Sequence, residues 1–174
     1  LVDMHENEIR FRKEAAKWVG NDEDGLKLLE KLDTDVLTPE YLTARNQIMV
    51  RYNYALMADG TDYNIYATEI FNQYYSILDW INCLNVDSSV YLDFILSKEF
   101  EKFSLLGKLD YKVPYYNING NRDYQTNYEL AQEYFDQINA PYKEMYIMKN
   151  TTHGLLESKS TEFSEILHKI TADR

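Results

Sequence analysis

Two polar loops in the last third of the sequence contain residue types that can transfer protons. The first ends in Asp123 and follows a β-prone run over residues 113–119, and the second contains His153 and follows residues 144–148. If these runs are consecutive parallel strands, their carboxyl ends place Asp123 and His153 side by side. A carboxylate beside an imidazole fixes the tautomer of the ring and stabilises the imidazolium, as a general base serving a hydroxyl nucleophile requires. The pair therefore has the chemistry of a general base and of the carboxylate that orients it.

Each of these residues also has a simpler interpretation. Asp123 could only be a turn residue whose side chain accepts local backbone N–H groups, and His153 could be a solvated loop histidine. Taken loop by loop, the residues leave both interpretations open, and the catalytic one is favoured only when the joint placement of the two residues is combined with the resemblance given below. The three histidines show no metal-ligand spacing, so the sequence predicts no metal site and no cofactor; they are His5, His153 and His168.

The elements that must position this pair lie after Gly107, where strand and helix patterns alternate. Thr126-Asn-Tyr-Glu129 matches a capping box and predicts a helix that runs to Ile138. A final amphipathic helix is predicted from apolar residues at helical spacing: Phe163, Ile166, Leu167 and Ile170. Strand, helix, strand and helix at these lengths indicate a right-handed βαβ unit in a parallel sheet.

Residues 1–106 are almost entirely helical in pattern. Thr38-Pro39 is a typical helix start, with a hydroxyl that can cap and a proline in the first turn. The expected helices are 5–19, ended by Gly20, then 22–31, 38–56, 66–82 and one that begins at Ser88 or Ser89 and runs to Phe100. The predicted fold is α/β and predominantly helical, with a helical region over residues 1–106 and a βαβα unit over residues 107–174.

The charge of the chain excludes two classes of partner. Its 174 residues include 29 Asp and Glu but 18 Lys and Arg, giving a formal net charge of −11. Such a chain repels phosphate backbones and anionic membrane surfaces, so we expect no nucleic-acid or membrane partner. The single cysteine, Cys83, allows no internal disulfide, and no apolar run reaches membrane-spanning length, which together indicate a cytoplasmic protein.

The residues around the two loops resemble the end of α/β-hydrolases of the proline-iminopeptidase-like group. The resemblance rests on Val113-Pro-Tyr-Tyr-Asn-Ile-Asn-Gly-Asn-Arg-Asp123, Thr126, Ala131-Gln-Glu-Tyr-Phe135, Asn139-Ala-Pro-Tyr-Lys143 and Thr152-His153-Gly154. It implies that Asp123 is the acid after the seventh strand and His153 the base after the eighth. It also implies that the helical region is the substrate-selecting cap of such an enzyme, entered through Val2-Asp-Met-His-Glu-Asn-Glu8.

The sequence departs from this family in lacking a nucleophile. None of its six glycines forms Gly-x-Ser-x-Gly, and the oxyanion-hole loop is missing too. We therefore expect the chain, which begins at Leu1, to be the C-terminal part of a serine peptidase or esterase and to be inactive alone. The alternatives are a non-catalytic helical interaction domain, or one chain of a two-chain hydrolase.

Two expectations concern partners and substrate. A strand over residues 113–119 would lack its neighbour on one side, and an exposed strand edge can pair with another chain, so we expect self-association there. The substrate in the complete enzyme would be a small molecule or short peptide. The acidic residues of the first two helices are expected to form a solvated face, with binding of a substrate amino group as the less favoured role; they are Glu6, Glu8, Glu23 and Asp24.

Overall fold

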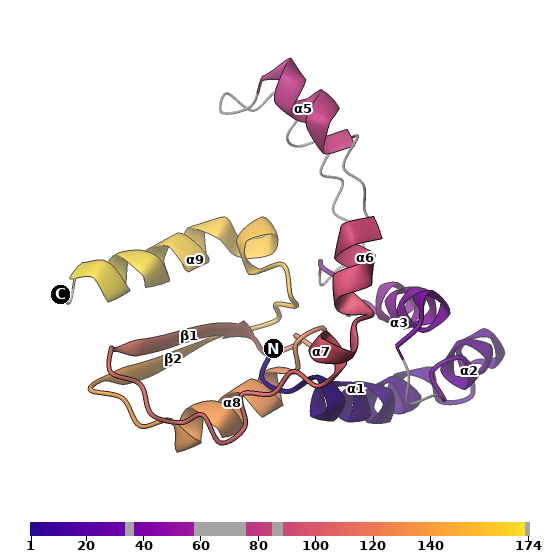
Figure 1. Cartoon of the computed structure of the whole chain (residues 1–174), viewed down its shortest axis with the longest axis horizontal. Helices are drawn as coiled ribbons and strands as arrows, with labels where there is room; N and C mark the ends of the chain where they lie inside the picture. Colours follow the sequence, from indigo (N-terminus) through magenta and orange to yellow (C-terminus); the bar gives the residue numbers. More distant parts are fainter. Residues whose placement is uncertain (34–36, 58–75, 85–88, 173–174) are drawn as a thin grey trace.

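The structure, a computed structural model, describes residues 1–33, 37–57, 76–84 and 89–172. It shows a mixed α/β chain, mostly helical, with one small parallel sheet (Figure 1). The helical region contains α1 (Met4–Val19), α2 (Glu23–Glu30), α3 (Pro39–Arg51), α5 (Ile77–Leu84), α6 (Ser89–Ile95) and α7 (Lys98–Glu101). The rest contains β1 (Tyr115–Gly120), α8 (Tyr128–Gln137), β2 (Lys143–Met148) and α9 (Leu155–Ala172).

The predicted helix starts and stops of the first part follow local backbone chemistry. The Asp22 and Thr38 side chains cap α2 and α3 by accepting the backbone N–H of Asp24 and of Tyr41. The sequence prediction placed the end of the third helix near residue 56, but α3 ends at Arg51. The expected helix 66–82 overlaps α5, and its earlier part lies outside the described residues.

Asn53 explains why α3 ends early. Its backbone has a left-handed φ of 62°, which asparagine tolerates better than most residues. The N–H of Tyr54 then donates to the Met49 carbonyl at 2.7 Å, and the N–H of Asn53 to the Val50 carbonyl at 3.3 Å. These two bonds form a Schellman motif that satisfies the last carbonyls of the helix and turns the chain away from its axis.

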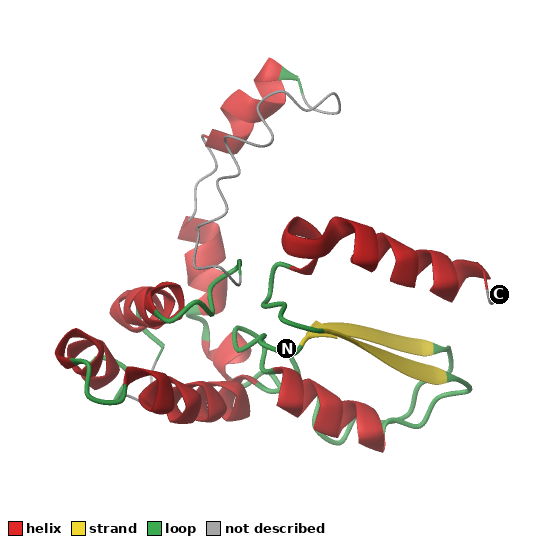
Figure 2. Cartoon of the chain, turned by 180° about the vertical axis from the view of Figure 1, so that it is seen from behind, coloured by secondary structure: helices red, strands yellow, loops and turns green. Residues whose placement is uncertain are grey.

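The two strands pair in parallel, as the alternation of strand and helix predicted. The register runs from Tyr115 opposite Lys143 to Gly120 opposite Met148. Helices α8 and α9 cover opposite faces of this sheet, so the two views show it as a middle layer (Figures 1 and 2). Strand β1 begins two residues later than expected, which leaves Pro114 outside the ladder, where its missing N–H costs no hydrogen bond.

The capping box predicted at the start of α8 is wrong. The N-cap is Asn127, whose side chain accepts the Leu130 N–H, while the Thr126 N–H and hydroxyl both donate to the Asp123 carboxylate. The Asp123 carboxylate therefore binds the Thr126 N–H that Glu129 would accept in a capping box, and the Thr126 hydroxyl donates to Asp123 instead of accepting a helix N–H.

Two hydrophobic clusters stabilise the described chain. One lies between α1, α2 and α3, and its buried members are Phe11, Ala15, Leu32, Tyr41, Ala44, Ile48, Met49 and Ala55. The other joins the N-terminal segment to α8, and its buried members are Val2, Leu130, Ala131, Tyr134 and Ile138. The apolar stripe of α9 is only partly covered, since Ile170 is buried but Leu167 is exposed, and the two-stranded sheet offers a narrow surface.

Helix α5 lies apart from the other described elements, and α6 lies between it and α7 (Figure 1). Both helices carry exposed apolar side chains, of which Ile77 in α5 is 79% exposed and Val90 in α6 is 72% exposed. None of the described helices combines the length and apolar character needed to cross a bilayer.

Candidate active site

The structure brings Asp123 and His153 together at the carboxyl ends of β1 and β2. Nδ1 of His153 lies 2.9 Å from Oδ2 of Asp123. Because an ionised carboxylate only accepts, the geometry assigns the proton to Nδ1 and leaves Nε2 with a lone pair. Asp123 is 3% exposed, whereas the His153 side chain is 36% exposed, so the acid is buried and the base is accessible.

The Asp123 carboxylate is held by its own loop. Oδ1 accepts the backbone N–H groups of Gln125 and Thr126, both at 3.0 Å, and Oδ2 accepts the Thr126 hydroxyl at 3.0 Å. With His153 added, the two oxygens accept four hydrogen bonds, so both the turn role and the pairing role foreseen for Asp123 exist together. These bonds hold Oδ2 in one orientation toward the imidazole, and they satisfy a buried charge.

Gly120 allows the two loops to approach each other closely. A Cβ at position 120 would overlap the carbonyl oxygen of Thr151, so only glycine permits this spacing. The N–H of Arg122 donates to that carbonyl at 3.0 Å, and the N–H of Asn150 donates to Oδ1 of Asn121 at 2.7 Å. Residues 119–123 and 148–153 are thus joined by main-chain contacts that set the separation of Asp123 and His153.

The helical region also contacts the acid loop, which is the segment 121–127 between β1 and α8. Asn7 in α1 accepts the Asn127 N–H at 2.8 Å and donates to the Gln125 carbonyl at 3.3 Å. Arg45 in α3 donates through Nη2 to the carbonyls of Tyr124, at 3.2 Å, and Gln125, at 3.1 Å. The acid loop therefore depends on residues far earlier in the chain.

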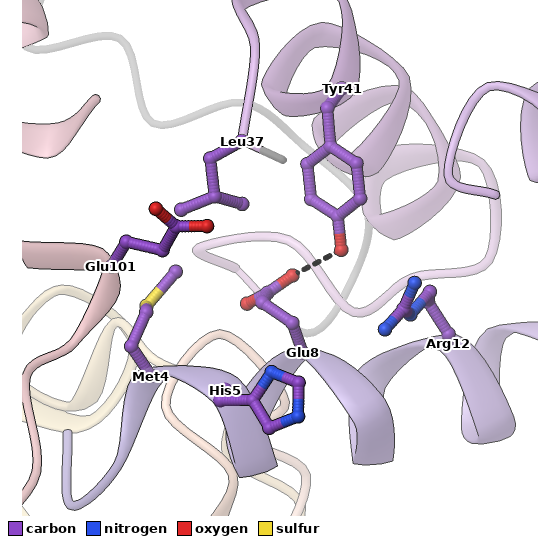
Figure 3. Close-up of a pocket in the computed structure, with 7 residues that line it drawn as sticks. All are labelled: Met4, His5, Glu8, Arg12, Leu37, Tyr41 and Glu101. Atoms are coloured by element: carbon purple, nitrogen blue, oxygen red, sulfur yellow. Dashed lines mark hydrogen bonds between the residues drawn. The ribbon is translucent and has the colours of Figure 1, made fainter. Parts of the chain in front are cut away.

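Arg45 is itself fixed by a buried ion pair with Glu8. The distance from Nε to Oε2 is 2.9 Å, and each side chain is 9% exposed. The Tyr41 hydroxyl donates to the same carboxylate oxygen at 2.7 Å (Figure 3). The side chain of Asn7 donates to the other oxygen at 2.9 Å. Burial and the nearby Glu8 charge raise the pKa of Tyr41 above its ordinary value, so its hydroxyl stays a donor.

This network corrects the expectation that Glu8 belongs to a solvated acidic face. The carboxylate is buried, and the cavity beside it has a volume of about 40 Å³, lined by Met4, His5, Glu8, Arg12, Leu37, Tyr41 and Glu101 (Figure 3). A substrate amino group there would compete with three donors already bound to Glu8. Glu6, Glu23 and Asp24 are partly or fully exposed, as the solvated interpretation expected.

Sequence reasoning missed Asn7 and Arg45. A signal for Arg45 existed, since it lies at helical spacing between Tyr41 and the buried pair Ile48 and Met49, which places a cation on the apolar face of α3. An unexplained cation on such a face indicates a buried anionic partner. Asn7 offers no comparable signal.

A second, polar cavity lies between β1, α8 and the N-terminal segment, with a volume of about 130 Å³. Leu1, Val2 and Thr126 are among its lining residues. Two further lining residues, Asn119 and Asn127, each bury a side-chain atom, Oδ1 and Nδ2 respectively, without a hydrogen-bond partner.

Within the described residues, His153 makes no hydrogen bond to a serine or cysteine, and no group of three or more His, Cys, Asp or Glu could hold a metal ion. Comparison of the chain with protein families, with curated proteins and with solved structures gives no match. The geometry of the acid and the base is therefore the observation on which function must be argued.

Proposed function

We propose that Asp123 and His153 are the acid and base of a serine-hydrolase triad, in a protein related to the proline-iminopeptidase-like α/β-hydrolases. The observation that carries the proposal is the 2.9 Å contact between a buried carboxylate and an accessible imidazole at the ends of adjacent parallel strands. Nε2 of His153 would take a proton from the nucleophile and later give it to the leaving group, while Asp123 stabilises the imidazolium.

On this proposal the chain supplies the acid, the base and a substrate-selecting helical region, and the nucleophile comes from other polypeptide. The substrate would be a small ester or a short peptide. The absence of Gly-x-Ser-x-Gly from the sequence means that the 174 residues alone should not turn over such substrates.

The test uses the longest polypeptide encoded in frame with this chain, treated with a fluorophosphonate that labels activated serines. We expect labelling of that polypeptide and none of the 174-residue chain alone. Asp123→Asn should slow turnover by about 10⁴-fold because the imidazole loses its tautomer partner, and His153→Ala should abolish labelling. Wild-type labelling in both variants would contradict the assignment. If labelling appears only after a separate serine-containing chain is added, the two-chain form of the proposal is the correct one.

We further propose that the chain self-associates with a second copy. Two features support this: the edge of β1 away from β2, and the exposed apolar faces of α5 and α6. The same apolar faces would serve the alternative role of a non-catalytic interaction domain. Because each copy carries a net charge of −11, association should strengthen with added salt.

Light scattering at tens of micromolar protein tests this second proposal. We expect a mass above that of the monomer that rises with ionic strength. Ile77→Lys with Leu78→Lys should restore the monomer if α5 mediates contact, and should leave the mass unchanged if the β1 edge does. A monomer at all salt concentrations would rule out self-association.

A further inference from the structure

Residues 53–56, which follow α3 directly, contact both loops of the candidate active site. The Asn53 carbonyl accepts a hydrogen bond from Nη2 of Arg122 at 3.1 Å, and the Arg122 guanidinium lies 4.7 Å from the centre of the Tyr54 ring. At the other end, the Leu56 carbonyl accepts the Thr152 hydroxyl at 2.7 Å and the Gly154 N–H at 2.9 Å. A four-residue segment of the helical region therefore touches the residue before Asp123 and both neighbours of His153.

The contact at the Leu56 carbonyl is tight and buried. Thr152 has no exposed surface, so its hydroxyl has no access to solvent as a substitute partner. A Cβ at position 154 would lie 2.5 Å from the Leu56 carbonyl oxygen, so this approach requires glycine. The two donors flank His153 in the chain and leave the imidazole itself free to face Asp123.

The rest of the structure fixes this segment firmly. The Schellman motif at Asn53 sets the direction in which the chain leaves α3. The Tyr54 ring stacks on Trp18 of α1, with 3.9 Å between ring centroids, and meets Tyr124 of the acid loop edge to face at 5.3 Å. Segment 53–56 is therefore a rigid reference to which both loops are attached.

We propose that the Leu56 carbonyl, through Thr152 and Gly154, is a positioning group that aligns His153 with Asp123. His153 itself makes one strong side-chain contact, to Asp123, so its alignment depends on how the backbone on either side is held. Before His153, Thr151 is tied to the acid loop through Arg122, and after it the Gly154 carbonyl accepts the Ser158 N–H at 3.0 Å at the start of α9. Among the described contacts, the Leu56 carbonyl is the acceptor that binds the neighbours of His153 on both sides. The helical region thereby controls the geometry of the base as well as substrate access.

The catalytic consequence of this inference rests on the proposed function, but its structural content does not. An error of about 1 Å in the position of a reacting group can cost about 10²-fold in rate. Displacement of segment 53–56 would therefore reduce the effectiveness of His153 without any change to Asp123 or His153 themselves.

Imidazole NMR on the 174-residue chain tests the inference without a nucleophile. A proton on Nδ1 that donates to Asp123 gives a low-field resonance that exchanges slowly with solvent. We compare Thr152→Val, which keeps the shape of the side chain but loses the hydroxyl, with Thr152→Ser, which keeps the hydroxyl. Thr43→Val is the matched control, because the Thr43 hydroxyl donates to the Pro39 carbonyl within α3 alone, at 2.8 Å.

We expect the parent, Thr152→Ser and Thr43→Val to show the resonance, and Thr152→Val to exchange it about tenfold faster, the effect of losing one buried hydrogen bond. Tyr54→Leu is a second, more distant variant that should also speed the exchange, although Tyr54 does not contact His153. If Thr152→Val fails to fold by circular dichroism, Tyr54→Leu carries the test.

Three outcomes are distinguishable. Equal exchange in Thr152→Val, Tyr54→Leu and Thr43→Val would overturn the positioning role while leaving the acid–base pair intact. Faster exchange in the first two variants alone supports the inference. A parent chain without a low-field resonance, or one in which Asp123→Asn leaves that resonance unchanged, would remove the acid–base pair and the proposed function together with the inference.

Discussion

The acid loop and the histidine loop, residues 149–154, follow adjacent strands but are held in different ways. The acid loop is bound by two side chains of the helical region, Asn7 of α1 and the buried Arg45 of α3. The carboxylate of Asp123 in this loop accepts four hydrogen bonds. The histidine loop is held mainly by backbone groups, through the carbonyls of Leu56 and Thr151, and its ring is one-third exposed. The Asp123 side chain is therefore held by direct hydrogen bonds, whereas His153 is held largely through the residues on either side of it.

Under the proposed function, this difference has a physical reason. An acid that orients an imidazole must keep its charge and direction, so burial with full hydrogen bonding is suitable. A general base must meet the nucleophile and the leaving group in turn, so its reactive nitrogen needs access. The helical region serves both needs, since the same elements bury the acid loop and attach to the residues flanking His153.

The largest effect is expected at Arg45, which binds the acid loop. Arg45→Met removes the partner of Glu8 and two hydrogen bonds to the acid loop, so an unpaired charge stays buried. We expect the free energy of unfolding in urea to fall by about 3–5 kcal/mol. The double variant Glu8→Gln with Arg45→Met should recover part of the loss, because no charge is then left unpaired.

Arg51→Met provides the matched control for Arg45. Arg51 makes comparable bonds to Asp22, at 2.6 and 2.9 Å, but on the surface. Its loss should change the free energy of unfolding much less than the loss of Arg45, because solvent screens an exposed ion pair. Equal effects at positions 45 and 51 would show that the buried network does not stabilise the acid loop.

Tyr41→Phe sharpens the comparison by removing one donor and no charge. The Tyr41 hydroxyl binds Glu8, so its loss should reduce the free energy of unfolding by about 2 kcal/mol, the contribution of a hydrogen bond to a charged group. Tyr142→Phe is the control, because Tyr142 donates to Glu144 at 2.8 Å on the surface. Similar losses for both variants would contradict the importance of burial.

The dependence of the free energy of unfolding on alkaline pH, compared between wild type and Tyr41→Phe, gives an independent measurement. Burial, and secondly the Glu8 charge, raise the pKa of Tyr41 above the ordinary 10.0. A raised folded-state pKa contributes stability that is fully present below pH 10 and is lost as pH rises through the folded value. The advantage of wild type over Tyr41→Phe should therefore shrink only above pH 10, whereas a constant difference would exclude the titration of Tyr41.

The sequence predicted the parts of this arrangement that follow from local patterns. Alternation of strand and helix indicated the parallel pair, and the position of polar loops after the strands indicated Asp123 and His153. Thr38 and Thr126 show where such rules fail. Both match a cap, yet at Thr126 the earlier carboxylate of Asp123 binds the N–H and the hydroxyl, and a local pattern cannot rank the two.

Contacts between distant segments are harder to predict. The pairing of Glu8 with Arg45 joins two helices, and each residue alone resembles an ordinary charged side chain. The Leu56 carbonyl has no signature at all, since every residue has a backbone acceptor and only the fold selects this one. The Glu8–Arg45 pair holds Arg45 where it binds the acid loop, and the Leu56 carbonyl binds the histidine loop. The contacts that support the two loops are therefore the part of the site that the sequence did not predict.

The smallest effect is expected where α1 meets α8 on the surface. Arg10 binds Glu133 through two hydrogen bonds, at 2.8 and 2.7 Å, and this pairing lowers the pKa of Glu133 below its usual 4.5. A lowered folded-state pKa contributes stability that is present above pH 4.5 and is lost as pH falls through the folded value. Because Glu133 is more than half exposed, Glu133→Gln should cost only about 0.5 kcal/mol at neutral pH.

The contribution of this pair should also fall in high salt, since exposed charges are screened. Glu162→Gln is the control, because Glu162 pairs with Lys159 within α9 and joins no separate elements. A loss for Glu133→Gln that exceeds 2 kcal/mol, or one that persists at pH 3, would mean that α1 and α8 depend on this surface contact. The acid loop, which enters α8 at its first turn, would then be held by exposed as well as buried charge, and the contrast between the two loops would have a different origin.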